Sequence, residues 1–224
     1  MANSNACGND PRSSPRASGL RSITDPRVDR AVAVVASLPF VYMAYYRVIH
    51  DGLDVPCMAM VLQYALLITT MAARRPPVRV TTKPLYWATA FVATYWSFMT
   101  PRSHRAGIAI APTWTTHALA VASLVIAVFA RLSLGRNIGF VPAQRSIVTS
   151  YAYSIVRHPI YTAIFVSLTG VVLRSFSPQN LLILAIGAGL FVVKTFMEED
   201  FLGEDATYAR YMKVVRWRWI PGLA

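Results

Sequence analysis

Acidic residues are scarce in this chain of 224 residues, which has 10 Asp and Glu against 22 Lys and Arg. The interval from Val55 to Met197 contains no Asp or Glu at all. Ionisable residues inside membrane segments usually mark the path of a transported ion. A chain without carboxylates over this interval is therefore a poor candidate for an ion transporter.

Charged residues of both signs are also few, at 14% of the chain, whereas about a quarter is usual in soluble domains. Hydrophobic residues make up 55%, and the mean hydropathy is positive. This composition indicates an integral membrane protein. The net charge of +12 does not indicate nucleic-acid binding, because the basic residues lie in loops between apolar runs and form no stripe on a soluble module. Contact with anionic membrane lipids explains their placement.

Cysteine is nearly absent as well: Cys7 lies in a polar segment and Cys57 in an apolar run. This pair gives neither a disulfide framework nor the ligand spacing of a metal site. We therefore expect no bound metal.

Apolar segments dominate what remains, and several approach the roughly 20 residues that cross a bilayer as a helix. The third and fifth are short. Beyond Glu198 the chain becomes amphipathic, which is typical of a helix lying at the membrane interface. We predict an all-α, polytopic membrane helix bundle of five to six spans with a C-terminal interfacial amphipathic helix. The segments are 31–49, 55–73, 84–100, 114–133, 159–174 and 179–197.

The distribution of Lys and Arg predicts the orientation of these segments. Basic residues are more frequent near both termini and in the second and fourth connections than in the first, third and fifth, of which the third holds Arg102 and Arg105. The excess of Lys and Arg on the cytoplasmic side then predicts that both termini are cytoplasmic. Residues 1–27 are rich in Ser, Arg, Asn and Pro, and we expect a disordered basic cytoplasmic tail there. Residues 28–133 form the N-terminal membrane helices.

The residues that could bind a ligand lie where the apolar segments end. Proline favours the first position of a helix, so Pro159 predicts a helix start with His158 as its cap. The free N–H groups at such a start favour an anion. The last apolar segment returns to the same side and is followed by an acidic cluster, which favours a cation. Together they predict a cradle for a zwitterionic ligand. The acids are Glu198, Glu199, Asp200, Glu204 and Asp205.

Residues 134–221 resemble the isoprenylcysteine carboxyl methyltransferase family, and more loosely the wider group of membrane methyltransferases that includes phospholipid methyltransferases. The order and spacing of the shared residues are specific for this group. Three positions depart from it, since Tyr151-Ala152 stands where the family usually has Gly-Pro, and Ala163 where it often has glycine. The bulk of Tyr151 is expected either to narrow the approach to the cofactor or to replace a lost contact. The resemblance runs through Leu134-Gly135-Arg136, Ile147-Val148-Thr149-Ser150, Tyr153, Val156-Arg157-His158-Pro159-Ile160-Tyr161, Glu198-Glu199, Leu202, Tyr208, Tyr211 and Arg218-Trp219-Ile220-Pro221.

The resemblance implies a catalytic region at 134–224 and S-adenosylmethionine as the methyl donor, bound at the cytoplasmic side. The catalytic candidates are Arg157, Arg218 and Glu199. An anionic acceptor is expected to be held by bidentate contact with Arg218, Arg216 or Arg157. The implied cofactor-binding residues are His158, Pro159, Tyr161, Tyr153, Glu198, Glu199 and Tyr211.

The methyl acceptor is expected to be lipophilic and to enter from the bilayer. The carboxylate of a prenylated cysteine or of a similar small lipophilic acid is the leading candidate, with a phospholipid amine, a phenolic lipid or a thiol as alternatives. A non-enzymatic transporter or assembly factor is the alternative from another class. The spans contain few ionisable residues to support it, because Arg47 and Lys194 lie near span ends and are expected to snorkel towards the interface.

Overall fold

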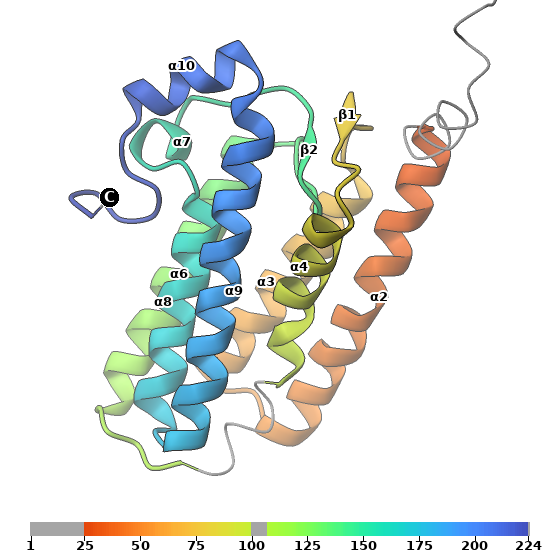
Figure 1. Ribbon diagram of the computed structural model, residues 1–224. Coiled ribbons are helices and arrows are strands. Elements are labelled where there is room, and N and C mark those ends of the chain that lie inside the picture. Colours follow the sequence, from red (N-terminus) through yellow and green to blue (C-terminus); the bar gives the residue numbers. More distant parts are fainter. Residues whose placement is uncertain (1–24, 100–106, 224) are drawn as a thin grey trace, which may run out of the picture.

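The computed structural model describes residues 25–99 and 107–223, and these form a bundle of roughly parallel and antiparallel helices (Figure 1). The fold is an all-α membrane bundle, as predicted. The structure also contains two antiparallel strands, β1 and β2, of two residues each. The sequence did not predict them, because segments this short show no recognisable pattern. The elements are α2 (Pro26–Asp51), α3 (Val55–Ala72), β1 (Arg79–Val80), α4 (Pro84–Tyr95), the 3-10 helix η1 (Trp96–Met99), α6 (Thr113–Leu134), β2 (Ala143–Gln144), α7 (Ala152–Ile155), α8 (Pro159–Arg174), α9 (Pro178–Gly203) and α10 (Ala206–Val214).

Several helices begin at a residue whose side chain caps the helix N-terminus. Asp54 caps α3 by accepting from the Cys57 amide, and Ser177 caps α9 by accepting from Asn180. The first helix begins earlier than predicted, because Asp25 caps it and Pro26 occupies its first turn. Residues 26 and 27 of the predicted disordered tail are therefore helical, while residues 1–24 lie outside the described part.

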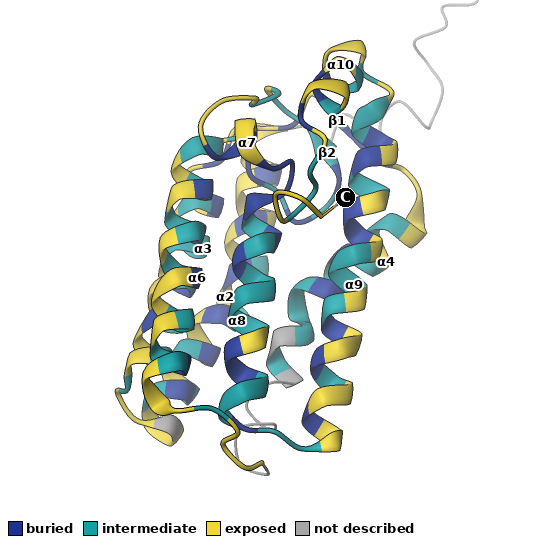
Figure 2. Ribbon diagram, turned by 90° about the vertical axis from the view of Figure 1, so that its left-hand side faces the viewer, coloured by how far each residue is buried: buried dark blue, intermediate teal, exposed yellow. Residues whose placement is uncertain are grey.

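Four of the described helices are long and apolar enough to cross a membrane: α2, α3, α6 and α9. The helices α4 and α8 are apolar but shorter, with 12 and 16 residues, in agreement with the short third and fifth segments. Large apolar side chains such as Tyr42, Val125 and Phe196 are exposed, and exposed residues run along α6 and α9 (Figure 2). The outer surface thus suits lipid, as expected for an integral membrane protein.

Packing brings the C-terminal helices together. Helix α6 packs along α8, α8 along α9, and α4 along α9, while α2 packs mainly on α3 and also contacts α4, where the Tyr95 hydroxyl donates to the Ala36 carbonyl at 2.7 Å. One end of the bundle gathers α7, α10, the strand pair, the start of α2 and the C-terminal segment (Figure 1). The amphipathic helix α10 lies at this end, where buried Tyr208 and Tyr211 pack against Ala152 and Tyr153.

Candidate functional site

A cavity of about 320 Å³ lies inside the bundle. Its walls come from α3, α6, α8 and α9, and the connection 137–148 together with α7 and α10 covers one end. Six of the predicted site residues line it, whereas Pro159, Glu199 and Arg218 do not. The six are Tyr153, Arg157, His158, Tyr161, Glu198 and Tyr211.

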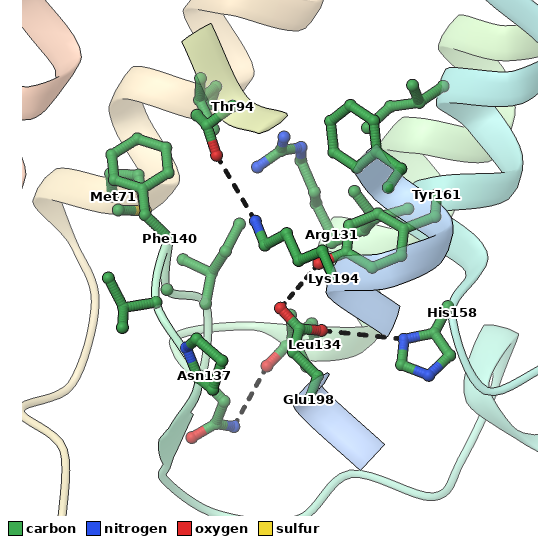
Figure 3. Close-up of a pocket in the computed structure, with 18 of the residues that line it drawn as sticks. Met71, Thr94, Arg131, Leu134, Asn137, Phe140, His158, Tyr161, Lys194 and Glu198 are labelled. Atoms are coloured by element: carbon green, nitrogen blue, oxygen red, sulfur yellow. Dashed lines mark hydrogen bonds and ion pairs between the residues drawn. The ribbon is translucent and has the colours of Figure 1, made fainter. Parts of the chain in front are cut away.

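Glu198 is the carboxylate that faces the cavity (Figure 3). The hydroxyl of Tyr161 donates to Glu198 Oε1 at 2.7 Å, and His158 Nδ1 lies 3.8 Å from Glu198 Oε2. The rings of His158 and Tyr161 are parallel, with centroids 5.5 Å apart. Both come from the start of α8, so the predicted meeting of the His-Pro step with the acid pair is present in the structure.

Glu199 has different neighbours, which already balance its charge. Its carboxylate lies 2.9 Å from Arg157 Nε, 3.0 Å from His158 Nε2 and 3.1 Å from Arg218 Nε. Glu199 and Arg157 are each 7% exposed. This arrangement ties α9 to the residues before α8 and to the C-terminal segment, and it holds His158 beside Glu198.

Backbone contacts hold the C-terminal segment in the same place. The amides of Arg157 and His158 donate to the carbonyls of Trp217 and Arg218 at 2.9 and 2.8 Å. Thr162 Oγ1 donates to the carbonyl of Trp219 at 2.6 Å. The closing residues of the sequence resemblance thus form part of the support for the α8 start.

Tyrosines form the roof of the cavity. The hydroxyl of Tyr211 donates to the carbonyl of Tyr153 at 2.7 Å, which joins α10 to α7. Burial raises the pKa of Tyr153, Tyr208 and Tyr211 above the ordinary value for a phenol. These side chains are therefore neutral at physiological pH and act as hydrogen-bonding and packing groups.

Three cationic residues that line the cavity were not predicted as site residues: Lys194, Arg131 and Arg145, the last of which lies 3.7 Å from Asp29. Lys194 does not snorkel, because it is 4% exposed and lines the cavity one turn from Glu198. Arg47, which does not line this cavity, was also expected to snorkel and is likewise buried, at 2% exposed. Arg131 of α6 lines the same cavity as Lys194. The expectation failed for Lys194 because a lysine near a span end is normally free to reach water, whereas here the covering connection and α10 enclose that end. Arg47 instead lines a second cavity, together with His50, Asp54 and Arg174.

Tyr151 neither narrows the cavity nor replaces a contact inside it. Its side chain is 71% exposed and does not line the cavity. Its backbone, however, has φ 55°, a conformation that suits glycine. The backbone at Tyr151 therefore has a conformation that glycine, the family's usual residue here, adopts without strain.

No cluster of His, Cys, Asp or Glu suited to a metal ion occurs within residues 25–99 and 107–223.

Residues 113–208 match the family model described as phospholipid methyltransferase. The match covers less than half of the chain; it begins at the first residue of α6, includes α7, α8 and α9, and stops within α10. It places this region in the group of integral membrane methyltransferases to which the sequence resemblance pointed. A comparison with curated proteins gives no significant match.

Proposed function

We propose that this membrane methyltransferase uses S-adenosylmethionine as its donor and methylates a lipophilic acceptor, with the carboxylate of a prenylated cysteine or a similar small lipophilic acid as the best candidate. Residues 134–224 form the catalytic region in this proposal, and both termini are cytoplasmic. The observation that carries it is the position of Glu198, which faces the cavity beside His158 and Tyr161.

The residues present fit this donor. Its ammonium and sulfonium are cations that the Glu198 carboxylate would favour. The amides of Arg157, His158 and Tyr161 already donate to backbone carbonyls, so the start of α8 would favour the donor's carboxylate mainly through the positive end of the helix dipole. The cavity volume of about 320 Å³ lies at the lower end of the usual range for ligand sites, about 300–1,000 Å³. His158, Tyr161 and Glu198 would hold the donor, with Tyr153 and Tyr211 closing the cavity above it.

When bound, the donor supplies a methyl group that its sulfonium has already activated. The chain's part is then to orient the acceptor and to exclude water, which contributes up to about 7–11 kcal/mol when the geometry is near ideal. The Glu199 arrangement contributes by fixing His158 and the α8 start. Arg157, Arg218 and Glu199 thus remain catalytic candidates that act at the edge of the cavity.

A phospholipid amine is the second candidate acceptor, and the description of the matched family favours it. An amine acceptor gives a product stable to mild base, whereas a carboxylate acceptor gives a base-labile methyl ester. Incubation with methyl-labelled donor and a total lipid extract, followed by mild alkali, separates the two.

Donor binding tests the proposal directly. Titration calorimetry of the detergent-purified protein with S-adenosylmethionine is expected to show saturable binding. Replacing Glu198 by Gln removes the charge that faces the donor, and we expect its affinity to fall by at least tenfold. The matched control is Glu204→Gln, which makes the same change at an exposed surface ion pair with Arg79 and should leave donor affinity unchanged. No saturable binding to the wild-type protein, or equal affinity in Glu198→Gln and wild type, would contradict the proposal.

A further inference from the structure

Besides Arg145, which is paired with Asp29, the cavity holds two cations that the donor does not require. Lys194 comes from α9 and Arg131 from α6, and both side chains lie along the cavity wall (Figure 3). Within residues 25–99 and 107–223, Lys194 Nζ reaches the hydroxyl of Thr94 at 3.4 Å but forms no ion pair with a carboxylate. Arg131 donates through Nη1 to Thr70 Oγ1 at 3.2 Å, and its buried Nε has no partner in the same part of the chain.

Such charges are costly to bury. A buried cation needs a carboxylate or another anion, since its loss of hydration is otherwise uncompensated. Among the described residues, each of these cations has only a neutral hydroxyl as its direct hydrogen-bond partner, and Glu198, one helical turn from Lys194, compensates that charge only from a distance. Lys194 also lies over the rings of Tyr161 and Phe191, at 5.6 and 5.9 Å from their centroids, which gives only partial compensation. An anionic ligand would supply what the protein does not.

The predicted acceptor-binding arginines are less suited to this task. Arg157 and Arg218 both contact Glu199, and Arg218 does not line the cavity. Their charge is thus already shared with a carboxylate. Lys194 and Arg131 are the cavity cations that form no close ion pair with a carboxylate among the described residues, although Glu198, one helical turn away, attracts Lys194 electrostatically.

The position of each cavity-lining side chain along α9 determines how deep in the cavity it lies. Lys194 comes four residues before Glu198 in α9. It therefore lies about one helical turn, or about 6 Å, further towards the other end of the bundle. Phe191 and Gly187 continue the same wall further in, and Ile164, Leu168 and Val171 line it from α8. The cavity therefore presents a carboxylate, then cations, then a mainly apolar section about 10 Å long from Ile164 to Val171, which also includes Ser167.

We infer that Lys194 and Arg131 bind the anionic group of the methyl acceptor, and that the acceptor is a lipophilic carboxylate whose apolar chain occupies the inner section. This inference rests on the proposed function and specifies its substrate class. One acceptor oxygen then lies beside the donor held at Glu198.

The transfer needs no base at this position. The carboxylate oxygen of the acceptor forms a bond to the methyl carbon, the bond between that carbon and sulfur breaks, and the electron pair stays on sulfur. No proton moves, and the products are a methyl ester and a neutral thioether. Lys194 and Arg131 act by binding and orienting the acceptor.

Binding of labelled hexadecanoate to the detergent-purified protein tests the inference without turnover. Unlabelled hexadecanoate is expected to compete at least tenfold better than its methyl ester or than hexadecylamine, which has the same chain and the opposite charge. Lys194→Met and Arg131→Met remove the charges at similar side-chain length, and each should weaken hexadecanoate binding at least tenfold. Lys194→Arg should retain most of it. Lys213→Met, at an exposed position on α10, is the matched control and should bind as wild type does.

Donor measurements on the same variants separate the remaining outcomes. S-adenosylmethionine affinity should change less than twofold in Lys194→Met, with an unchanged melting temperature. If Lys194→Met weakens S-adenosylmethionine but not its decarboxylated form, the cations bind the donor's own carboxylate and the inference is wrong. Equal competition by hexadecanoate and hexadecylamine also overturns it. Absence of donor binding in the wild-type protein would instead count against the proposed function, whatever the result with hexadecanoate.

Discussion

At the scale of single residues, neighbouring acids have separate tasks because successive helix positions point about 100° apart. Glu198 faces the cavity and accepts from one tyrosine, whereas Glu199 faces Arg157, His158 and Arg218. The sequence predicted that the acid pair meets the His-Pro step, because both lie at apolar segment ends on the same side. It did not predict which acid faces the ligand, since that depends on how α9 is rotated against α8.

Tyr151 gives a prediction at the same scale. A non-glycine residue at φ 55° and ψ −120° is strained, at a cost of about 1–3 kcal/mol. Tyr151→Gly should relieve this strain, and the entropy that glycine loses on folding offsets only about 0.5–1 kcal/mol. We expect a net gain of about 1 kcal/mol in the free energy of unfolding, measured by thermal denaturation in detergent.

Tyr151→Ala is the control for that measurement, because it removes the exposed ring but keeps the Cβ that causes the strain. It should give no comparable gain. Equal stabilisation by alanine and glycine would show that the ring, and not the backbone, is responsible.

At the scale of elements, α9 carries the site because one face places Glu198, Lys194, Phe191 and Gly187 along one cavity wall. The sequence predicted α8 with its observed bounds, since Pro159 starts it and Arg174 ends the apolar run. It missed α7 and the strand pair, whose few residues give no measurable periodicity. Enclosure of Lys194 was missed because it depends on the connection 137–148 and α10, and so on tertiary packing.

Gly187 allows α9 to approach the segment that follows α4. A Cβ at this position would lie 2.6 Å from Trp96 Cδ1 and 3.1 Å from Trp96 Nε1, and that ring donates to the Ile183 carbonyl at 2.7 Å. Gly187→Ala should therefore displace Trp96 and destabilise the protein by about 1–3 kcal/mol. Thermal unfolding in detergent measures the loss.

Gly189 provides the matched control two residues further along α9. A Cβ there meets nothing within 4 Å, so Gly189→Ala should be neutral or stabilising by up to about 1 kcal/mol through helix propensity. If both substitutions lower the melting temperature equally, the effect comes from helix α9 itself and not from its contact with Trp96.

At the scale of the whole molecule, the polar chemistry lies at one end of an apolar bundle. The Glu199 arrangement, the α8 start, α10 and the C-terminal segment lie at this end, together with the start of α2 (Figure 1). The connection from α8 to α9 lies at the other end. A cytoplasmic donor reaches the site only if the first end faces the cytoplasm, which agrees with the predicted orientation from Lys and Arg.

Cysteine labelling in intact cells tests that orientation. In a background carrying Cys7→Ser and Cys57→Ala, we expect a membrane-impermeant maleimide to label Gln179→Cys, an exposed position at the start of α9, without permeabilisation. Lys213→Cys, which is exposed on α10, should react only after the membrane is opened. The reverse pattern would place the cavity end outside the cell, away from the cytoplasmic donor. Because donor affinity is measured on purified protein, such a result would contradict the orientation while leaving the ligand assignment of Glu198 open to its own test.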